Sequence, residues 1–146
     1  MLFRSVMDLL EIAHLADRPI CEISSGEGRR VLIARALVHR PKAMILDEPA
    51  NSLDLGSMHQ LRSTMRRVAG QGTSLLLVTH HLADIVPEIE RVVLMRDGGV
   101  FFDGPKSAAL DSATLSALYQ TEVTVDRKST RLNSSHLRLS RMPSSA

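Results

Sequence analysis

The sequence predicts an α/β fold, in which helices pack on a parallel β-sheet. Two short apolar runs, residues 43–47 and 73–79, are separated by a segment whose apolar residues recur at helical spacing. Neither run alternates apolar with polar residues, which is typical of strands that are covered on both faces. The order strand, helix, strand predicts that the two strands lie parallel and that the helix crosses between them.

Three helices are expected in the first half of the chain, over residues 6–16, 25–39 and 55–69. The first stops before Pro19 and the second before Pro41, because the residue that precedes a proline is disfavoured in the helical conformation. The second also begins with a capping-box pattern, Ser24 followed three positions later by Glu27. The third presents one apolar face and ends near Gly70. These signals place the first expected strand between two helices.

The second half predicts shorter elements: a strand over 73–79, a short helix over 82–86, strands over 91–95 and 100–102, and a helical piece over 105–119. The two later strands flank Asp97, Gly98 and Gly99, a run that is typical of a hairpin turn. The chain is therefore expected to continue from the parallel unit into a hairpin and then into a helical segment.

Charge is unevenly distributed along the 146 residues. Residues 127–146 hold five basic and no acidic side chains, whereas residues 1–126 hold 13 basic and 16 acidic ones, a net charge of −3. The pI of about 9.1 therefore reflects the tail, and the acidic body argues against a nucleic-acid-binding function. The apolar runs are far shorter than a membrane-spanning helix, and the lone Cys21 excludes an internal disulfide.

Both ends of the chain have an unusual composition. Residues 127–146 are basic and include six serines, a composition for which disorder is expected. Residues 128–136 also resemble translated sequencing-adapter read-through, and residues 2–5 resemble its counterpart at the other end. We therefore expect the native sequence to span residues 6–126, with residues 1–5 and the tail as non-native ends. The alternative is a genuine, disordered basic tail.

An acidic pair, Asp47 and Glu48, ends the first apolar run and is followed at once by Pro49. Carboxylates at the end of a buried strand are costly unless a cation, water or hydrogen-bond donor offsets their desolvation. A hard cation such as Mg²⁺ takes oxygen ligands, and the transfer of a phosphoryl group to water needs a positioned proton acceptor. The alternative is an acidic cap for the following loop. A pair between a strand and a proline is less common, which favours a chemical role.

The helix start at Ser24, Ser25, Gly26 and Glu27 has two interpretations. The structural one is a capping box, a common way to begin a helix. The functional one is an anion site, because a helix N-terminus offers backbone N–H groups and a positive dipole end, and Gly26 lets a phosphate approach closely. The four residues alone do not decide between the two.

Two further polar residues lie at the ends of expected elements. Asp54 is placed to cap the helix that begins at Leu55. His80 follows the second apolar run, a position at which a lone histidine is commonly structural. Neither residue assigns a function by itself.

The longer stretch over residues 23–37 is more specific. It is similar, nearly position by position, to the signature motif and the following helix of the ATP-binding cassette of ABC transporters. Ser25 stands where that family usually has glycine, and Glu27 where it often has glutamine. In the family this segment clasps the γ-phosphate of ATP held by the other subunit. The resemblance therefore implies nucleotide-binding roles for Ser24, Ser25, Gly26 and Glu27.

The order and spacing of the remaining motifs resemble the same family. Ser24 precedes Asp47 by 23 residues, and Glu48 precedes His80 by 32, which matches the spacing of the signature, the Walker B motif and the switch histidine. By this resemblance Asp47 holds Mg²⁺ through water, and Glu48 is the catalytic base that orients or deprotonates the attacking water. His80 then contacts the γ-phosphate, and Asp54 lies in the D-loop beside the partner's nucleotide.

No phosphate loop of the form G-x-x-x-x-G-K-[ST] occurs in the 146 residues. The sequence thus resembles the C-terminal half of a cassette, a partial domain over residues 6–126. The fold that this implies is a P-loop NTPase-like parallel sheet that lacks the phosphate-loop strand, with part of the helical signature subdomain. We expect this chain alone neither to bind ATP tightly nor to hydrolyse it.

The resemblance implies the ATP-hydrolysing subunit of an ABC transporter, an ATPase that uses ATP and Mg²⁺. Its partners would be a second cassette, paired head to tail, and an integral membrane permease at the cytoplasmic face of the cell membrane, with no nucleic acid. Residues 86–92 and 103–105 are similar to cassettes of the molybdate and iron-complex uptake branch. The alternatives are a soluble ABC ATPase of the translation or DNA-repair type, a non-catalytic nucleic-acid binder and a functionless gene fragment.

Overall fold

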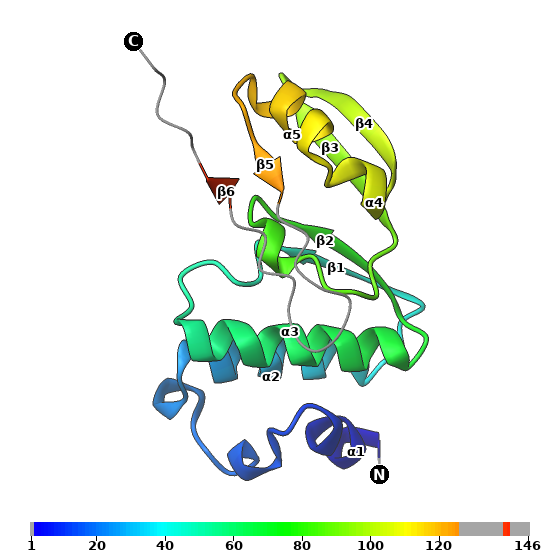
Figure 1. Ribbon diagram of the computed structural model, residues 1–146. Coiled ribbons are helices and arrows are strands. Elements are labelled where there is room, and N and C mark those ends of the chain that lie inside the picture. The colour runs from blue at the N-terminus through cyan, green and yellow to red at the C-terminus, as the bar shows by residue number, and fades with distance from the viewer. Residues whose placement is uncertain (1, 126–138, 141–146) are drawn as a thin grey trace. The chain divides into compact units, whose positions relative to one another are not determined.

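The computed structural model describes residues 2–125 and 139–140 of the chain, which falls into two compact units divided between Glu88 and Ile89. Figure 1 shows the helices and strands of each unit. The expectation of a disordered or non-native tail over residues 127–146 falls almost wholly outside the described residues. Within the part of the chain that is described, no helix is long and apolar enough to cross a membrane.

The first unit, in its described residues, combines helices with one pair of strands. Its elements are α1 Leu2–Leu9, the 3₁₀ helices η1 Ala13–Leu15 and η2 Ile20–Glu22, α2 Ser25–Leu37, β1 Ala43–Asp47, α3 Leu55–Gly70, β2 Ser74–Val78 and the 3₁₀ helix η3 Leu82–Asp84. β1 and β2 pair in parallel, with Ala43 opposite Ser74 and Asp47 opposite Val78. The predicted strand–helix–strand unit is therefore confirmed, and α3 is its crossover helix.

The core of the first unit lies among α1, α2, α3 and one face of the strand pair. Figure 1 shows α2 and α3 side by side, with α1 next to α2. The buried apolar residues of this core are Val6, Met7, Leu10, Ile12, Leu15, Ile33, Ala34, Leu37, Met44, Ala50, Leu61 and Val68. Complete burial of a side chain such as Leu10, Ile12 or Leu61 stabilises the fold by about 1.5–3 kcal/mol.

The other face of the β1–β2 pair is bare within the described residues. Ile45 of β1 is 68% exposed, and Leu76 and Val78 of β2 are 58% and 48% exposed. A hollow of about 260 Å³, lined mainly by apolar side chains, opens between α2 and β1. The two strands were predicted to be covered on both faces, and in this structure only one face is covered. Their apolar pattern is typical of strands that carry a further layer on the second face.

The first helix ends earlier than predicted. α1 stops at Leu9 because Glu11 takes a left-handed conformation with φ 56°. The N–H groups of Glu11 and Ile12 then donate to carbonyls of the last helical turn at 3.1 and 2.9 Å, a Schellman closure. Arg67 of α3 reinforces this end, since its guanidinium donates to the Leu9 carbonyl at 3.0 Å and pairs with Glu11 at 2.6 Å.

The second unit is built around the predicted hairpin. Its described elements are β3 Arg91–Arg96, β4 Gly99–Pro105, α4 Lys106–Ala109, α5 Ser112–Tyr119, β5 Thr124–Val125 and β6 Leu139–Ser140. Asp97 and Gly98 form the turn with φ 51° and 75°, as a type I′ turn requires at both positions. The predicted helical piece is divided into two helices. Asp111 caps the second by accepting a 2.6 Å hydrogen bond from the Thr114 N–H.

Candidate functional site

The acidic pair lies where β1 ends and the chain turns sharply. Glu48 still donates its N–H to the carbonyl of Val78 at 2.9 Å, which extends the pairing with β2 by one bond. Its backbone then adopts a left-handed conformation with φ 44°. A glutamate in this region is strained, and such strain is common where a side chain must be aimed at a site. The sharp turn at the end of β1 thus lies in Glu48 itself, directly before Pro49.

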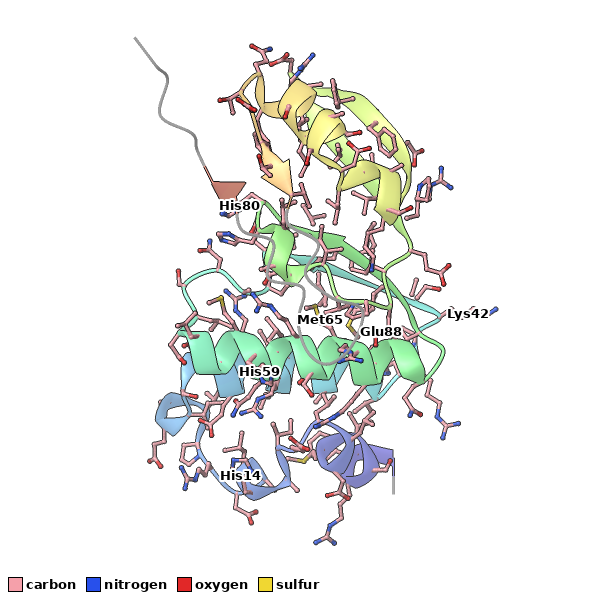
Figure 2. All side chains as sticks on the ribbon, in the orientation of Figure 1. His14, Lys42, His59, Met65, His80 and Glu88 are labelled. Atoms are coloured by element: carbon pink, nitrogen blue, oxygen red, sulfur yellow. The ribbon has the colours of Figure 1, made fainter. Side chains whose placement is uncertain are left out.

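The Glu48 carboxylate contacts His80, whose position after β2 is labelled in Figure 2. Its Oε1 accepts from the His80 N–H at 3.1 Å and lies 2.6 Å from His80 Nδ1. An ionised carboxylate only accepts, so Nδ1 is the donor in this contact. The second oxygen, Oε2, is buried and has no hydrogen-bond partner among the described residues. Glu48 therefore combines an oxygen anchored by His80 with a buried oxygen to which no described residue donates.

Asp47 supplies the other carboxylate of the pair, at the carboxyl end of β1. Within residues 2–125 and 139–140, no three His, Cys, Asp or Glu side chains form a cluster that could hold a metal ion. Mg²⁺ commonly keeps several waters and is bound through one or two carboxylates together with substrate phosphates. The exposed Asp47 supplies one carboxylate of the kind that such a Mg²⁺ takes.

The start of α2 is a complete capping box, as predicted. Ser24 Oγ accepts from the Glu27 N–H at 3.3 Å, and Glu27 Oε2 accepts from the Ser24 N–H and hydroxyl, each at 2.8 Å. His14 Nε2 lies 3.4 Å from the other oxygen of Glu27; Figure 2 labels His14 on the segment that precedes α2. These hydrogen bonds, the backbone one first, lower the pKa of Glu27 to about 2. Glu27 is thus ionised at neutral pH.

Gly26 is explained by packing against α3. A Cβ on Gly26 would lie 2.5 Å from Ser57 Oγ and 2.7 Å from Ser57 Cβ. Ser57 is itself fixed by the helix cap, because Asp54 accepts from its N–H at 3.0 Å and from its hydroxyl at 2.6 Å. These hydrogen bonds from Ser57 lower the pKa of Asp54. The start of α2 therefore contacts the start of α3: Gly26 packs against Ser57, and Ser57 is bonded to Asp54 of the predicted D-loop.

Sequence reasoning missed a buried carboxylate close to His80. Asp84 is 1% exposed and lies in η3, where a short helix was predicted. Its partners are Arg62 of α3 and the hydroxyl of Thr79. The sequence does contain one indication of it. Arg62 and Arg66 are four positions apart, and so are Asp84 and Glu88, so that two basic and two acidic residues share the same spacing. Four-residue spacing on a helix places charges on one face.

The predicted site residues form two groups within residues 2–125. Glu48 and His80 meet where β1 and β2 end, and Asp47 lies directly before Glu48. Gly26 and Asp54 lie together through Ser57, at the starts of α2 and α3. Ser24, Ser25 and Glu27 share that helix start with Gly26. No hydrogen bond recorded within these residues joins one group to the other.

The capping box predicts a pH dependence of stability. Because the pKa of Glu27 falls from 4.5 to about 2 on folding, its ionised form adds stability that is fully present above pH 4.5 and is lost as the pH falls toward about 2. We expect the melting temperature of the wild type to exceed that of Glu27→Gln above this window and to converge with it below. Thermal unfolding followed by circular dichroism across the window measures the difference, and a constant difference would contradict the assignment.

Comparison with known proteins relates these groups to one family. Residues 3–51 match the family described as ABC transporter. Over 119 residues the chain is 35% identical to the hemin import ATP-binding protein of Rhodococcus jostii, covering 82% of this chain and 41% of that protein. Over 111 residues it is 35% identical to an ABC transporter ATP-binding protein of Methanosarcina mazei, covering 73% of this chain and 39% of that protein.

A solved structure shares the fold. A metal-chelate type ABC transporter in an inward-facing conformation superposes with a TM-score of 0.78 at 27% identity, over 86% of this chain and 50% of that one. The chain thus spans half or less of the length of these relatives. The stretch that matches the family holds both the capping box of α2 and the acidic pair after β1. Sequence and fold agree, and the chain belongs to the ATP-binding cassette family of ABC transporters.

Proposed function

We propose that this chain is the part of an ABC-transporter ATPase that carries the signature motif, the catalytic glutamate and the switch histidine. The observation that best supports the proposal is the environment of Glu48. One of its carboxylate oxygens is anchored by His80, while the other is buried with no donor among the described residues. Such a carboxylate is suited to accept a proton from water, which hydrolysis of ATP requires of its base.

In the proposed reaction, Glu48 accepts a proton from the attacking water as the water oxygen bonds to the γ-phosphorus. The bond from that phosphorus to the β–γ bridging oxygen breaks, ADP leaves with the electron pair, and inorganic phosphate is formed. His80, whose ring is fixed by Glu48, contacts the γ-phosphate. Asp47 would hold Mg²⁺ that binds with ATP, and the ion would supply neutralisation of the phosphate charge there.

The helix start of α2 is proposed to act on the ATP of a second cassette. Its N-terminus supplies a positive dipole end, and the γ-phosphate of the partner's ATP would lie against Ser24, Ser25 and Gly26. Asp54 would reach the same interface, since it is linked to Gly26 through Ser57. The two cassettes would then pair head to tail, each closing over the nucleotide of the other.

The work that hydrolysis powers is proposed to be transport through an integral membrane permease, with the cassette docked at the cytoplasmic face. A metal chelate is the proposed cargo. Two similarities support this class: one relative is a hemin import protein, and one similar structure is of the metal-chelate type. Residues 86–92 and 103–105 are similar to cassettes of the molybdate and iron-complex uptake branch, and iron complexes belong to this class.

The proposal makes a prediction for the chain alone. The 146 residues contain no phosphate loop, so the purified chain is expected to show neither tight ATP binding by calorimetry nor release of phosphate. A complete cassette, defined here as this chain preceded by a half that contains a phosphate loop, is expected to hydrolyse ATP. Hydrolysis by the chain alone that depends on Glu48, or a folded complete cassette that is inert, would contradict the proposal.

A further inference from the structure

A buried carboxylate beside the switch histidine has no role in the reaction described above. Asp84 is 1% exposed, and an ionised group at such a depth is strongly destabilising unless it is paired and hydrogen-bonded. Arg62 satisfies one of its oxygens: Nε and Nη2 donate to Oδ1 at 3.1 and 2.9 Å. The Thr79 hydroxyl donates to the other oxygen, Oδ2, at 3.4 Å. Asp84 therefore joins α3 to the residue directly before His80.

The turn that carries His80 is closed by the same carboxylate residue. The Thr79 hydroxyl, which donates to Asp84, also accepts from the N–H of His81 at 3.0 Å. The N–H of Asp84 donates to the His81 carbonyl at 3.0 Å. The residues on both sides of His80 are thus fixed by bonds that lead to Asp84. His80 itself is 64% exposed, and its ring lies 3.9 Å from the ring of His81, one of the two neighbours that these bonds fix.

A second ion pair on the same helix provides a natural comparison. Arg66 lies four residues after Arg62, and its Nε donates to Glu88 at 2.7 Å; Figure 2 labels Glu88 next to α3. Arg66 and Glu88 are 53% and 30% exposed, and exposed pairs of this kind contribute little to stability. This pair has the same chemistry and spacing as the buried pair, but no hydrogen bond recorded within the described residues links it to the turn of His80.

We propose that Asp84, held by Arg62, is a positioning residue for the switch: through Thr79 it fixes the turn that presents His80 to Glu48. The catalytic meaning of this role depends on the proposed function, but the geometry does not. Since α3 is capped by Asp54 and bears both Ser57 and Arg62, the same helix then connects the contact with Gly26 to the switch. A shift of α3 would be transmitted to His80 through Arg62 and Asp84.

The test is a nuclear magnetic resonance measurement on the 146-residue chain, with nitrogen-15 in the histidines and the backbone, at one fixed pH. The signals of the His80 ring Nδ1 and backbone N–H report its contact with Glu48, and Glu48→Ala provides the reference for a lost contact. We expect Asp84→Asn to shift both signals toward that reference, because the amide donates where the carboxylate accepted. Glu88→Gln, the matched control on the exposed pair, is expected to leave both signals unchanged.

Thr79 supplies a milder pair of variants in case Asp84→Asn fails to fold. Thr79→Val removes the linking hydroxyl but leaves the Arg62–Asp84 pair, and it is expected to shift the His80 signals toward those of Glu48→Ala. Thr79→Ser keeps the hydroxyl and is expected to restore them. His80 signals that stay unchanged in a folded Thr79→Val chain overturn the proposal, as does an equal shift in Glu88→Gln. No hydrolysis is measured, so failure of the proposed function is distinguishable from failure of this role.

Discussion

Replacing Glu48 by glutamine in the complete cassette is expected to reduce ATP turnover by about 10²–10⁴-fold, the range attributed to a lost general base. The substitution removes the proton acceptor but preserves the fixed geometry. The amide oxygen of glutamine can still accept from His80, as Oε1 of Glu48 does. Phosphate release under saturating ATP measures the loss, and size-exclusion chromatography with ATP is expected to show that the nucleotide-bound dimer persists.

The control for this substitution is Glu88→Gln. It removes a carboxylate from the same unit, but from an exposed ion pair on α3. Its turnover is expected to stay within a factor of two or so of the wild type, since exposed pairs contribute about 0–1 kcal/mol. Unchanged turnover in Glu48→Gln would remove Glu48 from the mechanism. Loss of the ATP-bound dimer along with turnover would instead assign it a structural role.

Local chemistry explains which parts of the fold could be predicted. The capping box of α2 needs only Ser24 and Glu27, and the cap of α3 needs only Asp54. The hairpin turn needs only Asp97 and Gly98, whose side chains tolerate positive φ. Each of these signals lies within four consecutive residues, so the sequence alone was sufficient. The parallel pairing of β1 and β2 followed from the order of the elements.

Two backbone conformations could not be predicted, because the residues that adopt them rarely do so. Glu11 and Glu48 adopt positive φ, a conformation in which glycine or asparagine is the usual residue. The first shortens α1, and the second turns the Glu48 carboxylate toward His80. In both cases contacts from residues distant in sequence stabilise the strained backbone: Arg67 pairs with Glu11, and the Val78 carbonyl accepts from the Glu48 N–H.

The contacts of longest range were also the least predictable. Gly26 and Ser57 are 31 positions apart, and Arg62 and Asp84 are 22 positions apart. A glycine in a capping sequence suggests space for an anion, whereas the structure shows that a serine of another helix lies where a Cβ on this glycine would be. On the bare face of β1 and β2 the apolar pattern predicted a covering layer, and the described residues do not contain that layer.

Replacing Gly26 by alanine is expected to destabilise the fold by about 1–3 kcal/mol, the usual cost of adding a methyl group to a packed contact. Ser57 Cβ, at 2.7 Å from the added carbon, is attached directly to the backbone of α3 and cannot rotate away. Relief therefore requires the starts of α2 and α3 to separate. Each kcal/mol lowers the melting temperature by about 2–4 °C for a chain of this size, which calorimetry or circular dichroism resolves.

Gly28 provides the matched control, because it lies in the same helix but has open space. A Cβ there would meet only Ile23 Cδ1, at 4.0 Å, so Gly28→Ala is expected to stabilise the chain by about 0.5–1 kcal/mol through helix propensity. Adding Ser57→Gly to Gly26→Ala removes both clashing atoms and leaves Ser57 Cα at 3.6 Å. The double variant should then be no less stable than Ser57→Gly alone. If instead the stability losses of Gly26→Ala and Ser57→Gly add in the double variant, the starts of α2 and α3 are not coupled through this contact. The predicted signature and D-loop would then have to be coupled through other residues.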